Sequence, residues 1–305
     1  MTPAGARTPR AEPADTGAPR PASPDTAAPP AGPAGEPTTA ATLRARGLHV
    51  RHRKAEHDAV RDLDLAVRGG EILALVGPNG SGKSTALAAL GRGIAARAGT
   101  VLLGDADVWS RSARVFARTV ARLPQLPEAP EGLAVRELVA SGRHVHTPWL
   151  GTPGRADHLA VREALQAVDV GDLRGRKLET LSGGERRRAW LAMMLCQQAP
   201  VLLLDEPTAA LDLRHQYELL AVLRELNRTR GVTMVVVLHD LEHAARLADR
   251  VAVLQRGRLY DVGPPAACIT PAMLRDVFGV EARIGTEEGR LRIVVLGPAD
   301  PARHL

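Results

Sequence analysis

Apolar and polar residues alternate along this chain in two distinct rhythms. Positions 43–52 and 59–70 alternate every second residue, which is typical of strands with one buried face. Apolar residues recur every three or four positions in "HQYELLAVLRELNRTR" at 215–230, which is typical of an amphipathic helix. Continuous apolar runs such as "VLLLDE" at 201–206 predict strands that are buried on both faces. Because strands and helices alternate, we expect an α/β domain with a largely parallel sheet.

The same patterns give approximate bounds for the other elements. A helix is expected after residue 111, followed by a short strand that ends at Gln125. A C-terminal hairpin is expected from 281–284 and 290–297, joined by "GTEEG". Further strands are expected at 71–77, 100–108, 233–240 and 251–259. Further helices are expected at 83–95, 134–143, 155–168, 186–198 and 241–250.

Composition then divides the chain into segments. Residues 1–40 are mainly Pro, Ala, Gly and Thr, so they offer almost nothing to a core and are expected to form a disordered tail. The α/β domain is expected at 41–283, with a mostly helical insert at about 126–185. The hairpin and a short tail are expected at 284–305.

Charge and aromatic content narrow the classes of partner. The net charge is +6, but basic residues are spread along the chain and aromatic residues make up only 2%, so we expect no nucleic-acid partner. Attraction to an anionic membrane surface is equally compatible with this charge. No apolar run reaches the 18 or so residues that span a bilayer, and the first residues lack the apolar stretch of a signal peptide. We therefore expect a cytoplasmic protein.

A glycine-rich loop lies between a predicted strand and a predicted helix. "GPNGSGKS" fits the phosphate-binding pattern G-x-x-x-x-G-K-[ST], whose backbone N–H groups turn toward phosphate oxygens. Lys83 would reach the β- and γ-phosphates, and the Ser84 hydroxyl would ligate Mg²⁺. The residues expected to bind nucleotide in this P-loop are Gly77, Pro78, Asn79, Gly80, Ser81, Gly82, Lys83, Ser84 and Thr85.

Four polar side chains follow the ends of other predicted strands. Asp205 ends the buried run "VLLLD", where α/β folds bind ligands, and is expected to act on Mg²⁺. Glu206 follows it and is expected to polarise the attacking water. Gln125 is expected to touch both Mg²⁺ and this water, and His239 to contact the γ-phosphate. We therefore predict Glu206, His239 and Gln125 as catalytic residues, and Ser84, Gln125 and Asp205 as Mg²⁺ ligands.

A second pair of glycines occurs in "LSGGE" at 181–185. Ser182 and Glu185 have the spacing of a capping box, so a helix is expected to begin here. A helix start with free N–H groups and a serine hydroxyl is an anion site. One nucleotide does not need two glycine-rich phosphate sites from the same chain, so this second site raises the question of which nucleotide it binds. The residues expected to contact nucleotide here are Ser182, Gly183, Gly184 and Glu185.

The order and spacing of these motifs resemble the ATP-binding subunit of an ABC transporter, over about residues 42–283. The resemblance implies a P-loop NTPase core of the ABC type, with a mostly parallel sheet, an N-terminal antiparallel β subdomain and the helical insert. It implies that ATP and Mg²⁺ bind, and that ATP is hydrolysed. In that family "LSGGE" contacts the γ-phosphate of ATP held by the other subunit. The resemblance thus implies a head-to-tail dimer of two copies, with Asp212 of "LD" also at the nucleotide.

Longer stretches, such as "LDLRHQ" and "LRDVFGVEARI", resemble importers of iron-siderophores, haem and cobalamin. We expect an iron-siderophore first. The resemblance implies integral-membrane permease subunits as partners, a substrate-binding protein as an indirect one, and a position at the cytoplasmic face of the membrane. The family usually has an aromatic residue, most often Tyr, that stacks on adenine. In this sequence His52 stands at that position.

The sequence also bears on ABC-type ATPases that are not transporters and on nucleotide-binding regulators. A soluble ABC ATPase acting on DNA would carry long heptad insertions, one acting on ribosomes would carry two cores, and this sequence has neither. A nucleotide-binding regulator without turnover should lack Glu206. The pattern favours the ATPase subunit of an iron-siderophore, haem or cobalamin importer. The alternatives are the ATPase of another class of ABC importer and a soluble ABC ATPase that takes no part in transport.

Two smaller features are interpreted as structural. His144 and His146 form an H-x-H pair, but no third ligand is near in sequence, so solvated loop residues are favoured over a metal site. Cys196 lies in "AWLAMMLC" and is expected to be a small core residue.

Overall fold

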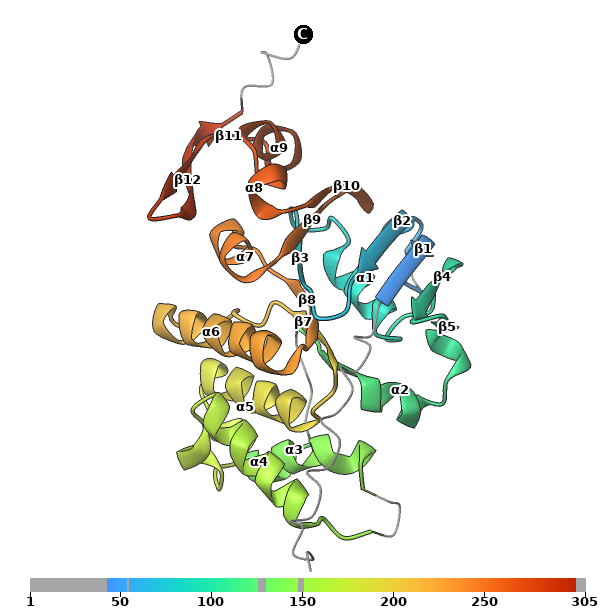
Figure 1. Cartoon of the computed structure of the whole chain (residues 1–305), viewed down its shortest axis with the longest axis vertical. Helices are drawn as coiled ribbons and strands as arrows, with labels where there is room; N and C mark the ends of the chain where they lie inside the picture. The colour runs from blue at the N-terminus through green and yellow to red at the C-terminus, as the bar shows by residue number, and fades with distance from the viewer. Residues whose placement is uncertain (1–42, 54, 126–129, 148–150, 300–305) are drawn as a thin grey trace, which may run out of the picture. The chain divides into compact units, whose positions relative to one another are not determined.

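The computed structural model describes residues 43–53, 55–125, 130–147 and 151–299, all within the compact unit Thr39–Leu305 (Figure 1). The predicted tail at 1–40 lies outside the described residues. A six-stranded sheet forms the centre of this unit, in the order β10-β9-β3-β8-β7-β6. Every neighbouring pair is parallel except β10 with β9, so the prediction of a largely parallel sheet is confirmed. Its strands are β3 (Ile72–Val76), β6 (Val120–Leu123), β7 (Val201–Asp205), β8 (Thr233–Val237), β9 (Arg250–Gln255) and β10 (Arg258–Gly263).

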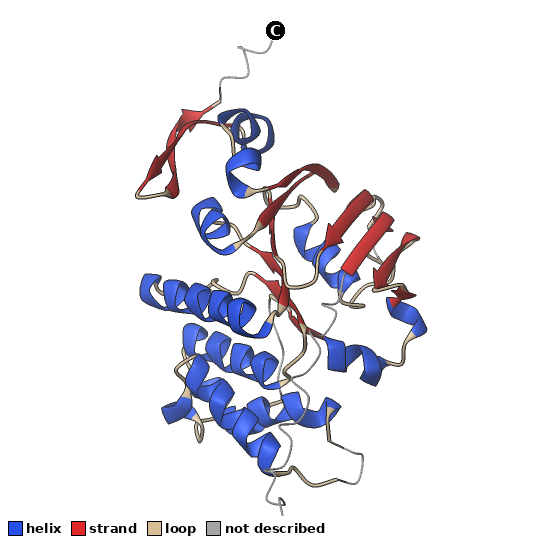
Figure 2. Ribbon diagram, in the orientation of Figure 1, coloured by secondary structure: helices blue, strands red, loops and turns tan. Residues whose placement is uncertain are grey.

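The central strands are apolar throughout because both of their faces are covered. On β3, Ile72, Ala74 and Val76 enter one buried cluster, while Leu73 and Leu75 enter the other. The first cluster also takes apolar residues from α6 (Leu213–Arg230) and α7 (Leu241–Leu247). The second takes them from α1 (Lys83–Leu90). Figure 2 accordingly shows these helices on opposite faces of the sheet.

A second sheet of four strands, in the order β2-β1-β4-β5, forms the predicted antiparallel β subdomain. Alternate residues of β2 are buried from Leu63 to Val67, because one face of this sheet packs into the second apolar cluster. The two-residue rhythm of the sequence therefore identified a real strand. The strands are β1 (Leu43–Val50), β2 (Val60–Val67), β4 (Ala98–Leu103) and β5 (Ala106–Asp107).

The predicted helical insert lies between β6 and β7, and its helices contact one another. Its last helix runs well past residue 185, the predicted end of the insert. Sequence reasoning also ended a strand at Gln125, whereas β6 ends at Leu123 and Gln125 stands in the segment that follows it. The helices on either side of β6 are α2 (Ala113–Thr119), α3 (Val135–Ser141), α4 (Arg155–Ala167) and α5 (Gly183–Cys196).

The C-terminal part holds elements that the periodicity did not predict. Short helical turns follow β10, namely α8 (Pro265–Cys268), α9 (Pro271–Met273) and a π-helical turn at Leu274–Phe278. They were missed because each is too short to show a 3.6-residue period. The predicted hairpin is present as β11 (Val280–Glu287) and β12 (Arg290–Pro298), with longer strands than expected. The predicted domain limit at 283/284 falls inside β11.

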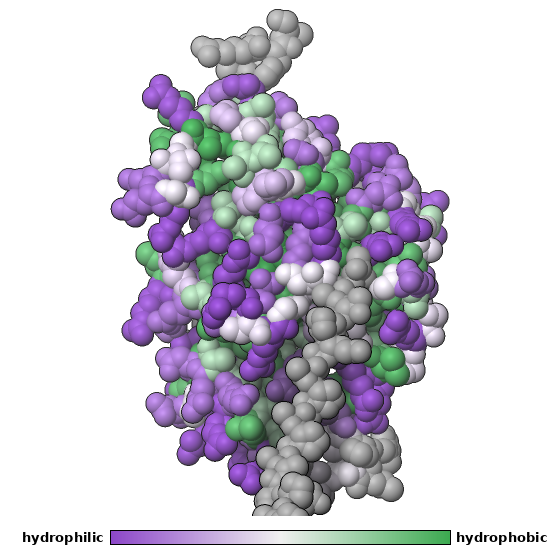
Figure 3. All heavy atoms as spheres, in the orientation of Figure 1, coloured by the Kyte–Doolittle hydropathy of each residue, from purple (hydrophilic) through white to green (hydrophobic). Residues whose placement is uncertain are grey.

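Hydrophilic side chains dominate the face of the molecule shown in Figure 3. Within the described ranges, no helix combines the length and apolar character needed to cross a bilayer.

Candidate functional site

The P-loop, Gly77–Thr85, connects β3 to α1, as the sequence predicts. Its turns require glycine at two positions. Gly77 has φ +146°, and a Cβ atom there would lie 2.2 Å from the Leu254 carbonyl oxygen. Gly82 has φ +100°, and a Cβ atom there would lie 2.4 Å from the Ala59 carbonyl oxygen. The loop is therefore walled in by backbone, which fixes the direction of its own N–H groups.

Lys83 begins α1 and is buried, although lysine rarely is. Its Nζ donates to the carbonyls of Gly77 and Pro78, at 2.8 and 2.9 Å. Burial lowers the pKa of the ammonium group, and the negative charges of Glu206 and Asp205 oppose that shift. The side chain thus lies across the P-loop, where a positive charge faces the loop interior.

Ser84 and Asp205 join the P-loop to the end of β7. The Ser84 Oγ donates to Asp205 Oδ1 at 2.9 Å. Burial raises the pKa of the Asp205 carboxyl, and the hydrogen bond from Ser84 opposes this shift. A hydroxyl and a carboxylate side by side are oxygen donors of the kind that Mg²⁺ prefers. The structure therefore brings two of the three predicted Mg²⁺ ligands into direct contact.

Glu206 lies just beyond β7 and is held by both neighbouring strand ends. Gln125 Nε2 donates to Glu206 Oε2 at 2.7 Å, and His239 Nε2 lies 2.5 Å from Glu206 Oε1. These three residues follow β6, β7 and β8, which are adjacent parallel strands. Glu206 also has φ +50°, a left-handed conformation that is uncommon for a residue with a side chain. The predicted catalytic residues are thus assembled at one edge of the sheet.

A cavity of ≈ 740 Å³ opens over this edge. His52 lines it, and its Nε2 lies 2.9 Å from Thr85 Oγ1, so the residue at the predicted adenine position faces the P-loop. We call this space the P-loop cavity. Its lining residues are His52, Ala59, Asn79, Gly80, Gly82, Lys83, Ser84, Thr85, Gln125, Glu206 and His239.

The signature turn, Leu181–Glu185, starts α5 as the capping box predicts. Ser182 Oγ accepts from the Glu185 N–H at 3.2 Å, and the Ser182 N–H donates to Glu185 Oε2 at 2.8 Å. The turn lines a separate, open pocket of ≈ 340 Å³, the signature pocket. None of its lining residues lines the P-loop cavity. They are Ser182, Gly183, Gly184, Glu185, Arg188, Ala210, Leu211, Asp212 and His215.

Asp212 lies in the signature pocket rather than in the P-loop cavity. It caps α6 by accepting from the His215 N–H at 2.9 Å, and its Oδ1 lies 2.6 Å from His215 Nδ1. The backbone hydrogen bond from His215 lowers the pKa of the Asp212 carboxyl, and the His215 side chain adds to the effect. Asp212 therefore stands beside the signature glycines, as a residue that contacts nucleotide together with them would.

Sequence reasoning missed Arg187, which joins the strand ends described above. It is buried, and its guanidinium donates to main-chain carbonyls at the ends of both β6 and β7. A run of three arginines at the start of a helix was the available signal, because one of three consecutive positions must turn toward the core.

The structure places the residues of both structural interpretations. His144 is exposed, as expected, but it lies in the 3₁₀ helix Gly142–Val145 rather than in a loop, whereas His146 follows this helix in a turn, is half-buried, and has its Nε2 2.7 Å from the Gln197 carbonyl oxygen. Within the described part of the chain, no group of three His, Cys, Asp or Glu side chains could hold a metal ion. Cys196 is buried as predicted, and burial raises the pKa of its thiol to about 11.

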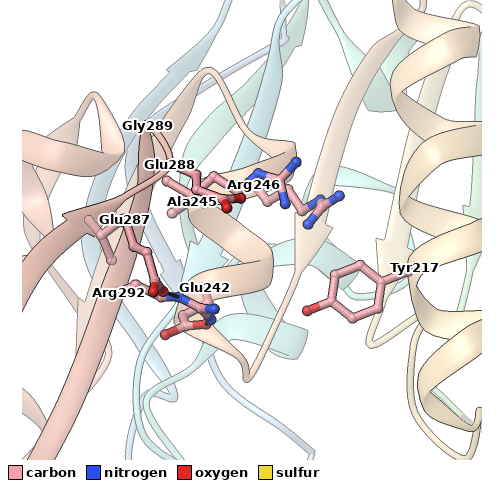
Figure 4. A pocket seen from close by; sticks show the side chains of 10 residues that line it. Tyr217, Glu242, Ala245, Arg246, Glu287, Glu288, Gly289 and Arg292 are labelled. Atoms are coloured by element: carbon pink, nitrogen blue, oxygen red, sulfur yellow. Dashed lines mark hydrogen bonds and ion pairs between the residues drawn. The ribbon is translucent and has the colours of Figure 1, made fainter.

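Another cavity, of ≈ 550 Å³, lies between α7 and the C-terminal hairpin (Figure 4). Several of its charged side chains already have partners within the chain. Arg292 bonds both Glu242 and Glu287, and the Arg246 guanidinium lies 4.9 Å from the centre of the Tyr217 ring. We therefore do not place the nucleotide site there.

Comparison with known proteins shows which family and which solved fold this chain resembles. The family model described as ABC transporter matches residues 60–209. The chain is 41% identical to the iron(3+)-hydroxamate import ATP-binding protein FhuC of Bacillus subtilis (strain 168), over 75% of this chain and 85% of the relative. It is 49% identical to the hemin import ATP-binding protein HmuV of Nocardia farcinica, over 78% of this chain and 82% of the relative. A bacterial ABC transporter cassette solved as a dimer has the same fold, with TM-score 0.67 and 24% identity, over 73% of this chain and 98% of that one.

Proposed function

The chain belongs to the ABC transporter family as an ATP-hydrolysing subunit of the import type, and from this premise we propose that it powers uptake of an iron-siderophore. Relatives named for hydroxamate, achromobactin, petrobactin and enterobactin transport support this cargo, at 35–42% identity. Haem is the second candidate, since the hemin relative is 49% identical. Cobalamin is the third, because a cobalamin import relative is 41% identical.

The observation that carries the catalytic assignment is the position of Glu206. Its carboxylate is held between Gln125 and His239, and all three side chains line the P-loop cavity. We assign Glu206 the orientation of the attacking water and His239 the contact with the γ-phosphate. Lys83 and the P-loop N–H groups hold the remaining phosphate oxygens, because they present positive charge to the same space.

Ser84, Asp205 and Gln125 are the residues that would hold Mg²⁺. Ser84 and Asp205 fit the ion because the Ser84 hydroxyl, which lines the P-loop cavity, already lies 2.9 Å from Asp205 Oδ1. When bound there, Mg²⁺ would supply positive charge that offsets the negative charge of the phosphate groups. Gln125 can serve the ion and the water without adding charge, since its side chain is a neutral amide.

The signature pocket supports a head-to-tail dimer of two copies. Its residues line a pocket that shares no lining residue with the chain's own P-loop cavity. We propose that Ser182, Gly183, Gly184, Glu185 and Asp212 of one copy close over the ATP of the other. The dimer would work at the cytoplasmic face of the membrane, on permease subunits that receive cargo from a substrate-binding protein. Closing and opening of the dimer would then move the helical insert against the permease.

Glu206→Gln tests the catalytic assignment. The amide keeps the shape of the side chain but cannot orient water as a carboxylate does, so turnover should fall by about 10²-fold or more. ATP binding should persist, and the ATP-bound dimer should accumulate in gel filtration. Glu288→Gln, in the hairpin turn, is the matched control and should hydrolyse ATP normally. Near-normal phosphate release by Glu206→Gln would reject the assignment.

Cargo is tested by deletion of the gene in its own host. Growth on a ferric siderophore as sole iron source should be impaired, with growth on inorganic iron unaffected. A defect confined to haem or cobalamin would move the assignment to that cargo. Normal uptake of all three would place the protein in another importer class.

A further inference from the structure

The residue that connects the signature helix to the catalytic edge is Arg187. It lies on α5, two residues after Glu185 of the capping box, and only 7% of its surface is exposed. Its Nη1 donates to Pro124 O at 2.9 Å and Gln125 O at 2.7 Å. Its Nη2 donates to Glu206 O at 2.8 Å and also to Asp205 O. One guanidinium therefore bonds the main chain at the ends of two neighbouring strands.

Taking the charge of the Arg187 guanidinium out of water costs free energy, which its hydrogen bonds must offset. Burial lowers the pKa of Arg187, and the charges of Asp205 and Glu206 oppose that shift. The planar fork offers donors in two fixed directions, which is what two pairs of carbonyls on separate strands require. A lysine ammonium would keep the charge, but it could not reach both pairs from one point.

One carbonyl pair includes that of Gln125 and the other includes that of Glu206, the predicted catalytic carboxylate. Gln125 and Glu206 are 81 positions apart in the sequence, yet their side chains bond at 2.7 Å. Glu206 has φ +50°, a conformation that persists only where its surroundings enforce it. The hydrogen bond from Arg187 Nη2 to the Glu206 carbonyl fixes that peptide group.

We propose that Arg187 is a positioning residue for ATP hydrolysis, which holds Glu206 and Gln125 in register with each other and with the signature helix. This inference rests on the proposed role of Glu206. Arg187 lines neither the P-loop cavity nor the signature pocket, so it acts through the main chain of Gln125 and Glu206 rather than on ATP.

The neighbouring arginine gives a matched control. Arg186 precedes Arg187 on the same helix and carries the same charge, but it is exposed. We expect Arg187→Lys to lower kcat by about 10- to 100-fold, since a misplacement of about 1 Å at a catalytic group has effects of that size. The Kd for ATP, measured by equilibrium dialysis with EDTA present, should change by less than about twofold, since the P-loop keeps its own supports. Arg186→Lys should leave both constants unchanged.

A purely structural role would give a different pattern. Turnover and ATP binding would then fall together, in proportion to the folded fraction seen by circular dichroism. Arg187→Gln serves as a second variant, because it removes the buried charge together with the guanidinium donors while keeping a polar side chain. Loss of the folded state in both variants would overturn the proposal, since Arg187 would then be required for folding.

A double-mutant cycle tests whether Arg187 acts through Glu206. In the Glu206→Gln background, adding Arg187→Lys should slow the residual turnover much less than it does in the wild type, because the carboxylate that Arg187 positions is already gone and only Gln125 is left to be misplaced. Multiplied losses would overturn the proposal. Failure of the proposed function is distinguishable: Glu206→Gln alone would then hydrolyse ATP normally. If Glu206→Gln is inactive and Arg187→Lys is fully active, only the positioning role fails.

Discussion

The P-loop and the signature turn are both glycine-rich turns that lead into a helix, yet they are built differently. The P-loop is enclosed by its own chain, with Leu254 behind Gly77 and Ala59 behind Gly82. The signature turn is enclosed on one side only: a Cβ atom placed on Gly184 would lie 3.1 Å from the Ala210 carbonyl oxygen, whereas nothing lies nearer than 3.9 Å to one placed on Gly183. The P-loop is thus walled in at two of its glycines, while the signature turn leaves Gly183 exposed.

This difference indicates where each turn finds its ligand. Within the P-loop cavity, the ends of three parallel strands supply the side chains opposite the loop. In the signature pocket, the described part of the chain supplies only the start of α5 and residues from 210–215 beside it. A phosphate held there would be covered on one side alone. The second cradle is therefore best explained as half of a site that another copy completes.

Among substitutions that test the difference between the two turns, the largest expected effect is on the stability of the fold. Gly77→Ala forces a Cβ atom against backbone at a positive φ, so it should destabilise the fold by about 3 kcal/mol. Gly183→Ala meets open space and should change the free energy of unfolding by less than about 0.5 kcal/mol. Urea denaturation of both variants measures the difference. Equal losses of stability would mean that the signature turn is enclosed as well.

Acidification should change the contributions of the two regions to the free energy of unfolding in opposite directions. The backbone hydrogen bond from Ser182 lowers the pKa of Glu185, so its contribution to stability is present above the pKa of the unfolded chain and is lost as pH falls. Burial raises the pKa of Asp205, so its contribution is present at low pH and is lost as pH rises through the folded-state pKa.

Urea denaturation between pH 7 and pH 3 can separate these trends. The stability advantage of the wild type over Glu185→Ala should shrink on acidification, while its advantage over Asp205→Asn should grow. Parallel trends for the two variants would contradict the assigned environments.

The smallest expected effect concerns the adenine position. His52→Tyr should tighten ATP binding, because a larger ring adds stacking area, worth about 0.5–1.5 kcal/mol. Loss of the contact with Thr85 offsets part of this gain, so we expect the lower end of that range. Isothermal titration with ATP gives the change directly. An unchanged affinity would mean that another residue faces the base.

Much of the P-loop edge was predictable because its signals are local. A strand, a glycine pattern and a helix follow one another within 72–90, and a buried run ending in Asp205 shows its own place on a sheet. The capping box likewise predicted the start of α5.

What the sequence did not show depends on contacts between distant segments. Arg187 meets carbonyls 62 and 63 positions before it, and no periodicity encodes that pairing. The predicted strand at 251–259 joined β9 to the start of β10, because the apolar pattern did not mark the turn at residues 256–257. The turns at 265–278 were missed because each is too short to show its own period. The separation of the two pockets also required the folded structure.

The shared site is tested most directly by mixing two inactive variants. Lys83→Ala removes a charge-assisted phosphate contact, worth about 1.5–3 kcal/mol, and Ser182→Arg fills the space at the signature turn. Each homodimer then carries a lesion in both sites. If a site combines the P-loop of one copy with the signature turn of the other, the mixed dimer has one intact site. ATP-dependent cross-linking between differently tagged chains should therefore reappear only in the mixture. If mixing restores no cross-linking, each chain uses its own signature turn, and the account of the second cradle is wrong.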